Sequence, residues 1–536
     1  MRSNYKTMSG ALWIAAAIAA PAAALADDSS CAALAATRLH HVTIEQATLQ
    51  PEGQPVDGAA IPDPSGAADA TPVAGLPAFC RIIGSAKPEA GSDVRFEVWL
   101  PRTDDWTGRF TGGNNGGLAG YISYADLAAA VAAGHAGAAT DTGHVGSTEV
   151  DSAWAKGHPE LIRDYGWRAI HITTVVAKRL SAAYYGREPD HSYFIGCSNG
   201  GRQGLMEAWR FPEDYDGIIA GAPAARFTEL TAAFVSTVQA QLPAGAALRA
   251  EQMPLLQSEV LKQCDALDGQ TDGLVAAPPA CRLDTAPLAC GTDNTPECFT
   301  PPQLGALTQI IDGRRDRYGH TVALGYQPSG SEGTPPGWGG WLSAGHGAPT
   351  PHALFARALL QDLMQRPSAT PETFDFDRDQ RTLDNELGPD LNVEPRLRRF
   401  FERGGKLILW QGWADAAVPP QLTLAFHRAV ARNAGAVADD ALRLFMVPGV
   451  QHCGSGTGPD VLGQIGAPPP EAEPDRNLGA ALEAWVENGR VPNRVVGGFS
   501  SDAAPGRERL VCAFPKHAEL RAGHDPNKGE SYVCRD

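Results

Sequence analysis

One short pattern constrains this chain more than any other: a serine within G-x-S-x-G, placed between a strand pattern and a helix pattern. Residues 192–196 read SYFIG, which is typical of a short buried strand, and residues 196–200 read GCSNG. The helical pattern RQGLMEAWRFP follows and ends at Pro212. A serine on such a sharp strand-to-helix turn is presented as a nucleophile. Alone, the five-residue pattern is weak in a glycine-rich chain, so this context carries the inference that Ser198 is catalytic.

Strand and helix patterns alternate on both sides of this turn. Residues 93–101 alternate like a strand, and residues 159–186 have helical apolar spacing. After the turn, residues 215–224 form the next apolar strand pattern. Strands that alternate with helices predict the α/β class, with a parallel sheet.

The alternation is interrupted once and then resumes. Residues 226–399 are loop-like, with four cysteines and clusters such as GYQPSGSEGTPPGWGGW. Strand patterns return at KLILW and LRLFMV. We therefore expect one α/β core in two parts, residues 27–225 and 400–536, with residues 226–399 inserted as a lid domain over the edge of the sheet where parallel strands end.

Residues 1–26 predict an export signal. Arg2 and Lys6 precede the apolar run at 11–20, and residues 24–26 read ALA, a typical cleavage site. A retained anchor helix is the alternative. No later segment has about 18 uninterrupted apolar residues, so we expect no membrane association after cleavage. The mature protein is expected to be periplasmic or secreted.

The charge of the chain bears on its partners. The formal net charge is −17 over 536 residues. Such an excess of negative charge repels nucleic acid and anionic lipid, so we expect neither as a partner.

A base and an acid for Ser198 stand after the two later strand patterns. Asp415 follows KLILW in the loop GWADAAVPP, and His452 follows LRLFMV in VQHCGSG. The order Ser, Asp, His is the order of the triad in α/β-hydrolases. Asp415 as a helix N-cap and His452 as an ordinary loop histidine are the alternatives. Three candidates in this order, each after a strand, favour a serine hydrolase.

The ten cysteines indicate disulfides, because export brings them into an oxidising compartment. If Ser198 and His452 meet, their neighbours Cys197 and Cys453 are brought together, and a bridge between them would contribute about 5 kcal/mol in the chain-entropy model. A free thiol beside the serine is the alternative. Many pairings are possible for the rest, and the attractive ones are Cys31 with Cys80, Cys264 with Cys281, Cys290 with Cys298, and Cys512 with Cys534.

These residues resemble the tannase and feruloyl esterase family, which includes the hydrolase of mono(2-hydroxyethyl) terephthalate. The mark of the family is Cys-Ser, Asp and His-Cys, with a disulfide between the two cysteines. This chain has the same arrangement at Cys197-Ser198, Asp415 and His452-Cys453. The resemblance runs from AFCRIIGSAKP to the C-terminal cysteines. It implies an α/β-hydrolase core, a large lid, no organic cofactor, and hydrolysis of esters of aromatic acids.

The family also carries a structural calcium ion in the lid, and CDALDGQTDGLV at residues 264–275 is similar to that site. Carboxylate and carbonyl oxygens suit a hard cation, although the spacing is not that of an EF-hand. A solvated acidic turn is the alternative. The candidate ligands are the side chains of Asp265, Asp268 and Asp272 and the backbone carbonyls of Gln270 and Leu274.

Acyl transfer also needs donors for an oxyanion. The backbone N–H of Asn199, next after the nucleophile, is one candidate. The second is expected from the glycine loop GGNNGG, from Gly116 or Gly117. A plain flexible turn is the alternative for this loop.

Substrate choice is expected to depend on the lid. Trp338, Trp341 and Trp413 could stack on an aromatic acyl ring, and Arg357 could meet the second carboxylate of a terephthalate monoester. Core packing and a helix-surface arginine are the alternatives. The sequence therefore predicts an esterase for feruloyl, galloyl or related esters, or for terephthalate monoesters. A peptidase, a lipase or a non-catalytic binding module is disfavoured by the complete triad with its paired cysteines.

Overall fold

The computed structural model describes residues 22–56, 73–291, 297–343, 349–500 and 505–536. Most of the expected export signal therefore lies outside the described residues. Of the helices that are described, none has the length and apolar character needed to cross a membrane.

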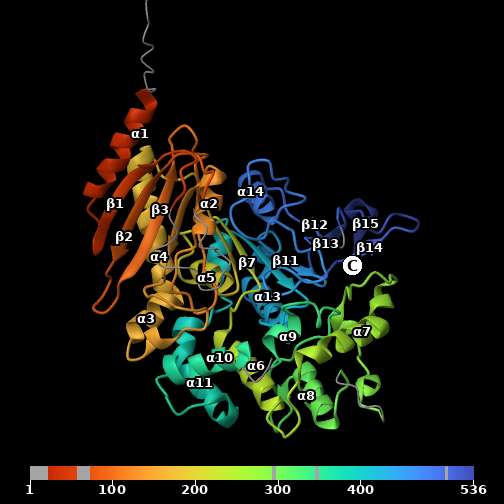
Figure 1. Ribbon diagram of the computed structural model, residues 1–536. Coiled ribbons are helices and arrows are strands. Elements are labelled where there is room, and N and C mark those ends of the chain that lie inside the picture. Colours follow the sequence, from red (N-terminus) through yellow and green to blue (C-terminus); the bar gives the residue numbers. More distant parts are fainter. Residues whose placement is uncertain (1–21, 57–72, 292–296, 344–348, 501–504) are drawn as a thin grey trace, which may run out of the picture.

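A nine-stranded sheet forms the centre of the molecule, in the order β1-β2-β3-β5-β4-β6-β7-β10-β11 (Figure 1). Strands β5, β4, β6, β7, β10 and β11 run parallel to one another, whereas β1, β2 and β3 extend the sheet in antiparallel pairs. The strands are β1 Val42–Gln50, β2 Phe79–Ala86, β3 Val94–Pro101, β4 Arg109–Gly112, β5 Ala136–Thr140, β6 His191–Cys197, β7 Gly217–Gly221, β10 Lys406–Gly412 and β11 Leu442–Val447.

The sheet is buried on both faces, which explains why its parallel strands read as continuous apolar runs. In β6, Phe194 packs into the larger core on one face, and its neighbours Tyr193 and Ile195 pack into the core on the other face. The same alternation places Ile408 and Leu409 of β10 on opposite faces.

Helices cover both faces of the sheet. The larger core contains residues of α4, α5 and α13, while α14 packs against β7 and β10 from the other side, and α2 packs against β5. These helices are α2 Tyr124–Ala132, α4 Ala169–Tyr185, α5 Asn199–Arg210, α13 Pro420–Ala434 and α14 Leu478–Asn488, and the N-terminal helix α1 is Ala22–Ala33.

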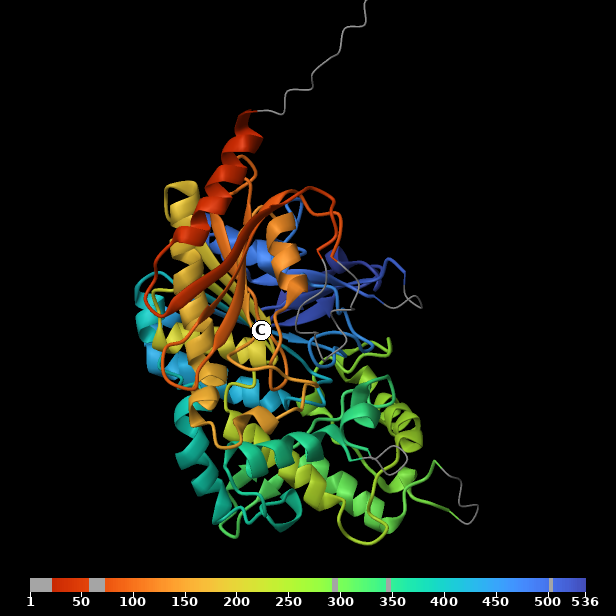
Figure 2. The ribbon, with the colours of Figure 1, turned by 60° about the vertical axis from the view of Figure 1, so that its left-hand side comes forward.

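The insert lies beyond the end of the sheet, as a separate layer below it in Figures 1 and 2. The expectation of a loop-like insert is wrong, because the segment contains several helices with cores of their own. Its helices are short and are interrupted by Gly and Pro, so the apolar spacing typical of a helix is hard to recognise in the sequence. The elements are α6 Phe227–Ala240, α7 Met253–Cys264, α8 Pro301–Asp312, β8 Arg314–Arg315, β9 Thr321–Ala323, α9 Gly337–Trp341, α10 Pro351–Arg357 and α11 Asp379–Leu391.

The predicted helix at 159–186 has an interruption. It consists of α3 Pro159–Arg163, a π-helical turn Asp164–Arg168, and α4. The short helix α12 Arg398–Glu402 precedes β10, and the C-terminal strands form two small antiparallel pairs. These strands are β12 Arg494–Gly498, β13 Glu508–Cys512, β14 His517–Leu520 and β15 Tyr532–Arg535.

All ten cysteines are described, and they form five disulfides in the pairs that the sequence favoured. The bridge between Cys197 and Cys453 joins the end of β6 to the loop after β11, with 5.9 Å between the Cα atoms. The other bridges are Cys31–Cys80, Cys264–Cys281, Cys290–Cys298 and Cys512–Cys534.

Candidate active site

Ser198 stands on the sharp turn between β6 and α5, with φ 61° and ψ −123°. Non-glycine residues avoid this conformation, which costs about 1–3 kcal/mol. Hydrogen bonds hold it: the Ser198 N–H donates to the Gly221 carbonyl at 2.9 Å, and the Ser198 carbonyl accepts from the Ala224 N–H at 3.2 Å. The flanking glycines are needed because a Cβ on Gly196 would lie 2.5 Å from the Gly200 carbonyl oxygen.

Asp415 is buried in the loop after β10, with 2% of its surface exposed. One carboxylate oxygen, Oδ1, accepts the backbone N–H groups of Ala417 and Val418, each at 2.8 Å. The other, Oδ2, accepts from Gln411 Nε2 and His452 Nδ1, each at 2.8 Å. Every donor stabilises the ionised carboxylate, which offsets the cost of burying its charge.

His452 receives its orientation from Asp415. Burial disfavours the charged imidazole, but the charge of Asp415 and its hydrogen bond outweigh burial, and the carboxylate of Glu149 adds to them, so the pKa of His452 is raised. With Nδ1 held by Asp415, Nε2 is the ring nitrogen that remains for chemistry. The indole ring of Trp341 meets the imidazole edge to face at 5.6 Å.

Ser198 and His452 line one cavity at the end of the sheet, between the strand loops and the insert. The Cys197–Cys453 disulfide joins the residue before the serine to the residue after the histidine. The other lining residues are Gly117, Asn199, Ala224, Phe227, Leu230, Thr231, Phe234, Trp341, Phe355, Leu359, Ala417 and Val418.

The expected oxyanion donors have different surroundings. Asn199 begins α5, so its N–H lies at a helix N-terminus beside the cavity. Gly117 also lines the cavity, with φ 51°, and its carbonyl accepts from Tyr165 Oη. The Gly116 N–H instead donates to Tyr121 Oη at 2.7 Å. Gly117 is therefore the better placed of the two glycines.

The glycine loop is not a free turn. Both the N–H and the side-chain amide of Asn114 donate to Asp126 Oδ2, at 2.9 and 2.8 Å. Asn115 Nδ2 donates to the carbonyls of Tyr121 and Thr140. The asparagines of GGNNGG thus hold the loop against the sheet, which favours a preorganised donor over a flexible segment.

Comparison with known proteins agrees with this geometry. The sequence profile described as "Tannase and feruloyl esterase" matches residues 80–535. This chain belongs to that family. A probable feruloyl esterase B-2 of Aspergillus flavus is 34% identical over 78% of this chain and 80% of its own length. An uncharacterized esterase of Xanthomonas campestris pv. campestris is also 34% identical, over 97% and 94%.

Solved structures give the same result. Feruloyl esterase B from Aspergillus oryzae superposes with a TM-score of 0.86 and 26% identity, covering 95% of this chain and all of the other. Tannin acyl hydrolase from Aspergillus niger, at 22% identity and a TM-score of 0.75, supports the fold alone, over 95% and 94% of the two chains. The expected α/β-hydrolase fold is confirmed, and this member of the tannase and feruloyl esterase family is a carboxylic ester hydrolase.

The acidic loop of the insert is where the sequence predicts a calcium site. Its backbone is folded around its own carboxylates: Asp265 accepts the N–H groups of Asp272 and Gly273, and Asp268 accepts that of Gln270. Three carboxylates on a tight loop closed by the Cys264–Cys281 bridge offer hard oxygen ligands, so the residues fit a calcium ion.

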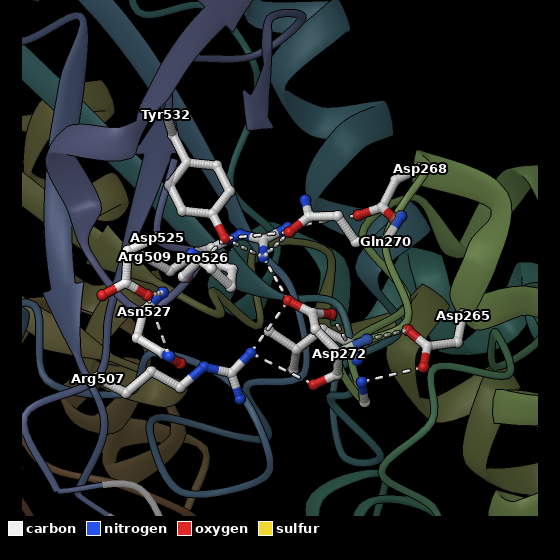
Figure 3. A network of polar contacts seen from close by, with 12 residues as sticks. Asp265, Asp268, Gln270, Asp272, Arg507, Arg509, Asp525, Pro526, Asn527 and Tyr532 are labelled. Carbon is white, nitrogen blue, oxygen red and sulfur yellow. Dashed lines mark hydrogen bonds and ion pairs between the residues drawn. The ribbon is translucent and has the colours of Figure 1, made fainter. Parts of the chain in front are cut away.

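Two arginines of the C-terminal segment reach the same loop (Figure 3). Arg507 and Arg509 both donate to Asp272 Oδ2, at 3.0 and 2.5 Å, and Arg509 Nη2 also lies 3.3 Å from Asp268 Oδ2. The side chain of Arg509 is 2% exposed. A bound cation would therefore share Asp268 and Asp272 with these guanidinium groups.

Of the expected substrate contacts, only Trp341 lines the cavity. Trp338 packs in a core of the insert, and Trp413 packs in the core under the sheet. Arg357 pairs with Glu372 at 2.6 Å, with 42% of its side chain exposed. Trp338 and Trp413 are therefore core residues, and Arg357 is a surface arginine on a helix.

Sequence reasoning missed Gln411 and the apolar wall of the cavity. Gln411 fixes Asp415, and its own Oε1 accepts from Thr423 Oγ1 at 2.7 Å. Its position at the end of a strand pattern, four residues before the acid, was the available signal. The wall residues of α6 gave none, because TELTAAFVSTV is an ordinary helix sequence until its neighbours are known.

Proposed function

We propose that this chain is an exported serine esterase that hydrolyses esters of aromatic acids through an acyl-enzyme on Ser198. Support comes from the family and from the cavity that a strained serine and an aspartate-held histidine both line. The relatives named feruloyl esterase suggest hydroxycinnamic acyl groups as the substrate class.

In the proposed mechanism, His452 Nε2 takes the proton of Ser198 Oγ as the oxygen attacks the ester carbonyl. Asp415 holds the imidazole in the required tautomer and stabilises its charged form. His452 then gives the proton to the departing alcohol, which leaves the acyl group on Ser198. A water molecule, deprotonated by His452, releases the acid in the second half of the reaction.

The developing negative charge would be met by the backbone N–H groups of Asn199 and Gly117. Both residues line the cavity, and Asn199 adds the positive end of the α5 dipole. The loss of one such donor in other enzymes costs about 10²–10³ in kcat. Fixed backbone donors are the reason to assign these positions rather than a side chain.

The observation that carries the proposal is the joint position of Ser198 and His452 in one cavity, with Asp415 behind the histidine. The test is initial-rate hydrolysis of methyl ferulate and 4-nitrophenyl acetate by wild type and Ser198→Ala. We expect loss of activity of about 10⁴-fold or more, with an unchanged circular dichroism spectrum. Ser147→Ala, on an exposed loop, is the matched control and keeps full activity. Equal turnover by Ser198→Ala would overturn the proposal.

The calcium site is the second part of the proposal. Asp265, Asp268 and Asp272, with the carbonyl oxygens of Gln270 and Leu274, would hold one Ca²⁺, whose role is to brace the insert. This site takes no part in the steps above. Because an ion that binds only the folded state raises stability by mass action, the melting temperature should increase with calcium concentration after chelation. No bound metal and no calcium-dependent shift would leave the loop as an arginine-bound acidic turn.

Export is the third part. Residues 1–26 have the features of a signal, and five disulfides are stable in an oxidising compartment. N-terminal sequencing of the mature protein from periplasmic and culture fractions tests this, with Asp27 as the expected first residue.

A further inference from the structure

The wall of the active-site cavity beyond the triad is apolar. Helix α6 contributes Phe227, Leu230 and Phe234, which are 5–6% exposed. Leu359, from the π-helical turn after α10, and Val418, from the loop of Asp415, close the opposite sides and are 1–2% exposed. An acyl group attached to Ser198 would therefore lie against aromatic and aliphatic side chains.

The polar side chains in this wall are already engaged with protein partners. Thr231 Oγ1 donates to the Phe227 carbonyl at 2.9 Å. The Asn199 side chain donates to the Asn115 carbonyl and accepts from Arg202 through Oδ1. Among the lining side chains that the structure describes, Trp341 has no hydrogen-bond partner, so its indole N–H is available to a substrate oxygen. Thr231 Oγ1 keeps its acceptor lone pairs, so the side chains of the wall offer a polar substituent few partners: this oxygen and the indole N–H.

The cavity is also narrow, with a volume of about 40 Å³. An engineered apolar cavity that accepts benzene measures about 150 Å³, so an aromatic ring can enter only if side chains move. Trp341 and Phe355 are half-buried lining residues and their rings stack at 6.4 Å, which makes them the side chains able to yield. Each further ring substituent requires a larger displacement.

Negative charge lies near the catalytic histidine, and the lining side chains that the structure describes include no lysine or arginine. Glu149 acts electrostatically on His452, and its backbone carbonyl accepts the Leu118 N–H next to the glycine loop. Arg357, the residue expected to meet a substrate carboxylate, is paired with Glu372 instead. An acyl group with an ionised carboxylate would enter this cavity without a counter-charge.

We propose that the acyl pocket of Ser198 selects uncharged, weakly polar aromatic acyl groups, of the cinnamoyl and benzoyl type, over galloyl groups and carboxyl-bearing acyl groups. This inference rests on the esterase function proposed above. The physical cause is that a buried hydroxyl without a partner loses its hydrogen bonds to water and gains none. A galloyl group brings three hydroxyls to a wall whose side chains offer the Trp341 indole N–H and the lone pairs of Thr231 Oγ1.

The test is the ratio of kcat/KM values in a series of esters with one alcohol: methyl cinnamate, methyl benzoate, methyl ferulate and methyl gallate. We expect methyl cinnamate to exceed methyl gallate at least about tenfold, from at least one unpaired hydroxyl. Methyl ferulate, with one hydroxyl, should fall within about tenfold of methyl cinnamate. Mono(2-hydroxyethyl) terephthalate should be at least about 100-fold poorer than methyl cinnamate.

Leu230→Gln sharpens the test, because it puts an amide into the wall at nearly constant volume. We expect this variant to lower the cinnamate-to-gallate ratio at least about fivefold. Leu230→Met, of similar size and without a hydrogen-bonding group, is the matched control and should leave the ratio unchanged. Hydrolysis of 4-nitrophenyl acetate by both variants reports that the catalytic residues are intact.

The outcomes separate this inference from the proposed function. If methyl gallate or the terephthalate monoester is hydrolysed as fast as methyl cinnamate, the inference is wrong while the aromatic esterase function stands. If 4-nitrophenyl acetate is hydrolysed but none of the aromatic esters is, the aromatic substrate class itself fails. If Leu230→Gln and Leu230→Met change the ratio equally, the shape of the wall rather than its polarity controls selection, which also overturns the inference.

Discussion

His452–Asp415 and His171–Asp214 are both hydrogen-bonded histidine–aspartate pairs, and of these two only the first borders a cavity with a nucleophile. His452 Nδ1 lies 2.8 Å from Asp415 Oδ2, and His171 Nδ1 lies 2.6 Å from Asp214 Oδ2. The bond lengths are nearly the same. The surroundings of each aspartate decide what each pair can do.

Asp415 has four hydrogen-bond donors and no neighbouring carboxyl group among those contacts. Asp214 instead lies beside Glu207, a side chain with 1% exposure whose two oxygens have no hydrogen-bond donor among the described residues. Burial raises the pKa of Glu207 well above its ordinary value, and the charge of Asp214 raises it further. The His171 ring also stacks on Phe211 at 3.6 Å, which fixes it as part of the packing.

The comparison teaches that a His–Asp hydrogen bond is not by itself catalytic. The catalytic pair needs an aspartate whose oxygens accept hydrogen bonds from the protein, a free second ring nitrogen, and a nucleophile in the same cavity. His171 lines a different cavity, with His40 and His41, away from Ser198. The second pair is a structural link between α4 and the segment after α5.

The largest expected effect is a loss of kcat that occurs when the aspartate of the catalytic pair is changed and not when that of the second pair is changed. Asp415→Asn keeps the shape but removes the charge that holds the histidine tautomer, so we expect kcat to fall about 10⁴-fold. Asp214→Asn makes the same chemical change at the second pair and should leave kcat within about twofold. Steady-state kinetics on methyl cinnamate and 4-nitrophenyl acetate measures both. Comparable losses in the two variants would mean that His171–Asp214 supports catalysis after all.

The disulfide at the catalytic pair gives the second prediction. Cys197→Ala with Cys453→Ala should reduce the free energy of unfolding by about 2–5 kcal/mol and also lower kcat, because the bridge joins the serine turn to the histidine loop. The control is Cys512→Ala with Cys534→Ala, which removes a bridge between β13 and β15.

The control should lose stability and keep its kcat. Urea unfolding and initial rates on the same samples separate the two quantities. If kcat survives loss of the Cys197–Cys453 bridge, then packing alone aligns Ser198 with His452, and the bridge acts on stability only.

The third prediction concerns Glu207. Its folded pKa is raised, so above about pH 4.5 the unfolded chain releases a proton that the folded protein keeps, and stability falls as pH rises toward the folded pKa. Asp214 disfavours its charge and Lys178 favours it. Glu207→Gln cannot titrate, so its stability relative to wild type should increase with pH, by up to about 1.4 kcal/mol per pH unit.

Thermal unfolding at pH 5, 6 and 7 measures this difference. Glu213→Gln, an exposed residue on the following loop, is the control and should show a flat difference. A Glu207→Gln variant that is less stable at pH 7 would mean that Glu207 is ionised in the folded protein. A cation between His171, Glu207 and Asp214, whose ligand atoms lie within 4.8 Å of one another, would then be the balancing charge.

The sequence predicts the catalytic pair but not the second His–Asp pair. Ser198, Asp415 and His452 were predictable because each sits at a strand end in a fixed chain order, and the cysteines beside two of them add a second constraint. The second His–Asp pair was not, because His171 and Asp214 come from a helix and a loop with no motif. The strands β1 and β2 were missed for a related reason: their partners are distant or antiparallel, and local alternation is weak there.

The substrate wall was also beyond the sequence. Trp341 was identified from an aromatic cluster, but Phe227 and Phe234 acquire their role only when α6 folds across the end of the sheet. Trp413 shows the converse, because its position two residues before Asp415 suggested the pocket and its side chain points into the core. Proximity in sequence to a catalytic residue says little about which side of the sheet a side chain takes.

The smallest expected effect concerns Glu149, the charge that the catalytic pair has and the second pair lacks. Glu149 contributes to the raised pKa of His452, after Asp415. His452 must be neutral to accept a proton, so kcat/KM should rise with pH through that pKa. Glu149→Gln removes part of the stabilisation of the imidazolium, which moves the rising limb to lower pH and makes the variant more active than wild type on that limb. Glu188→Gln, exposed and remote, is the control.

Because part of the effect of Glu149 is long-range, high salt should reduce the difference in pH profile between wild type and Glu149→Gln. An unmoved limb would mean that Asp415 alone sets the pKa of His452, and the catalytic pair would then differ from the structural pair only in its donors and its neighbouring serine.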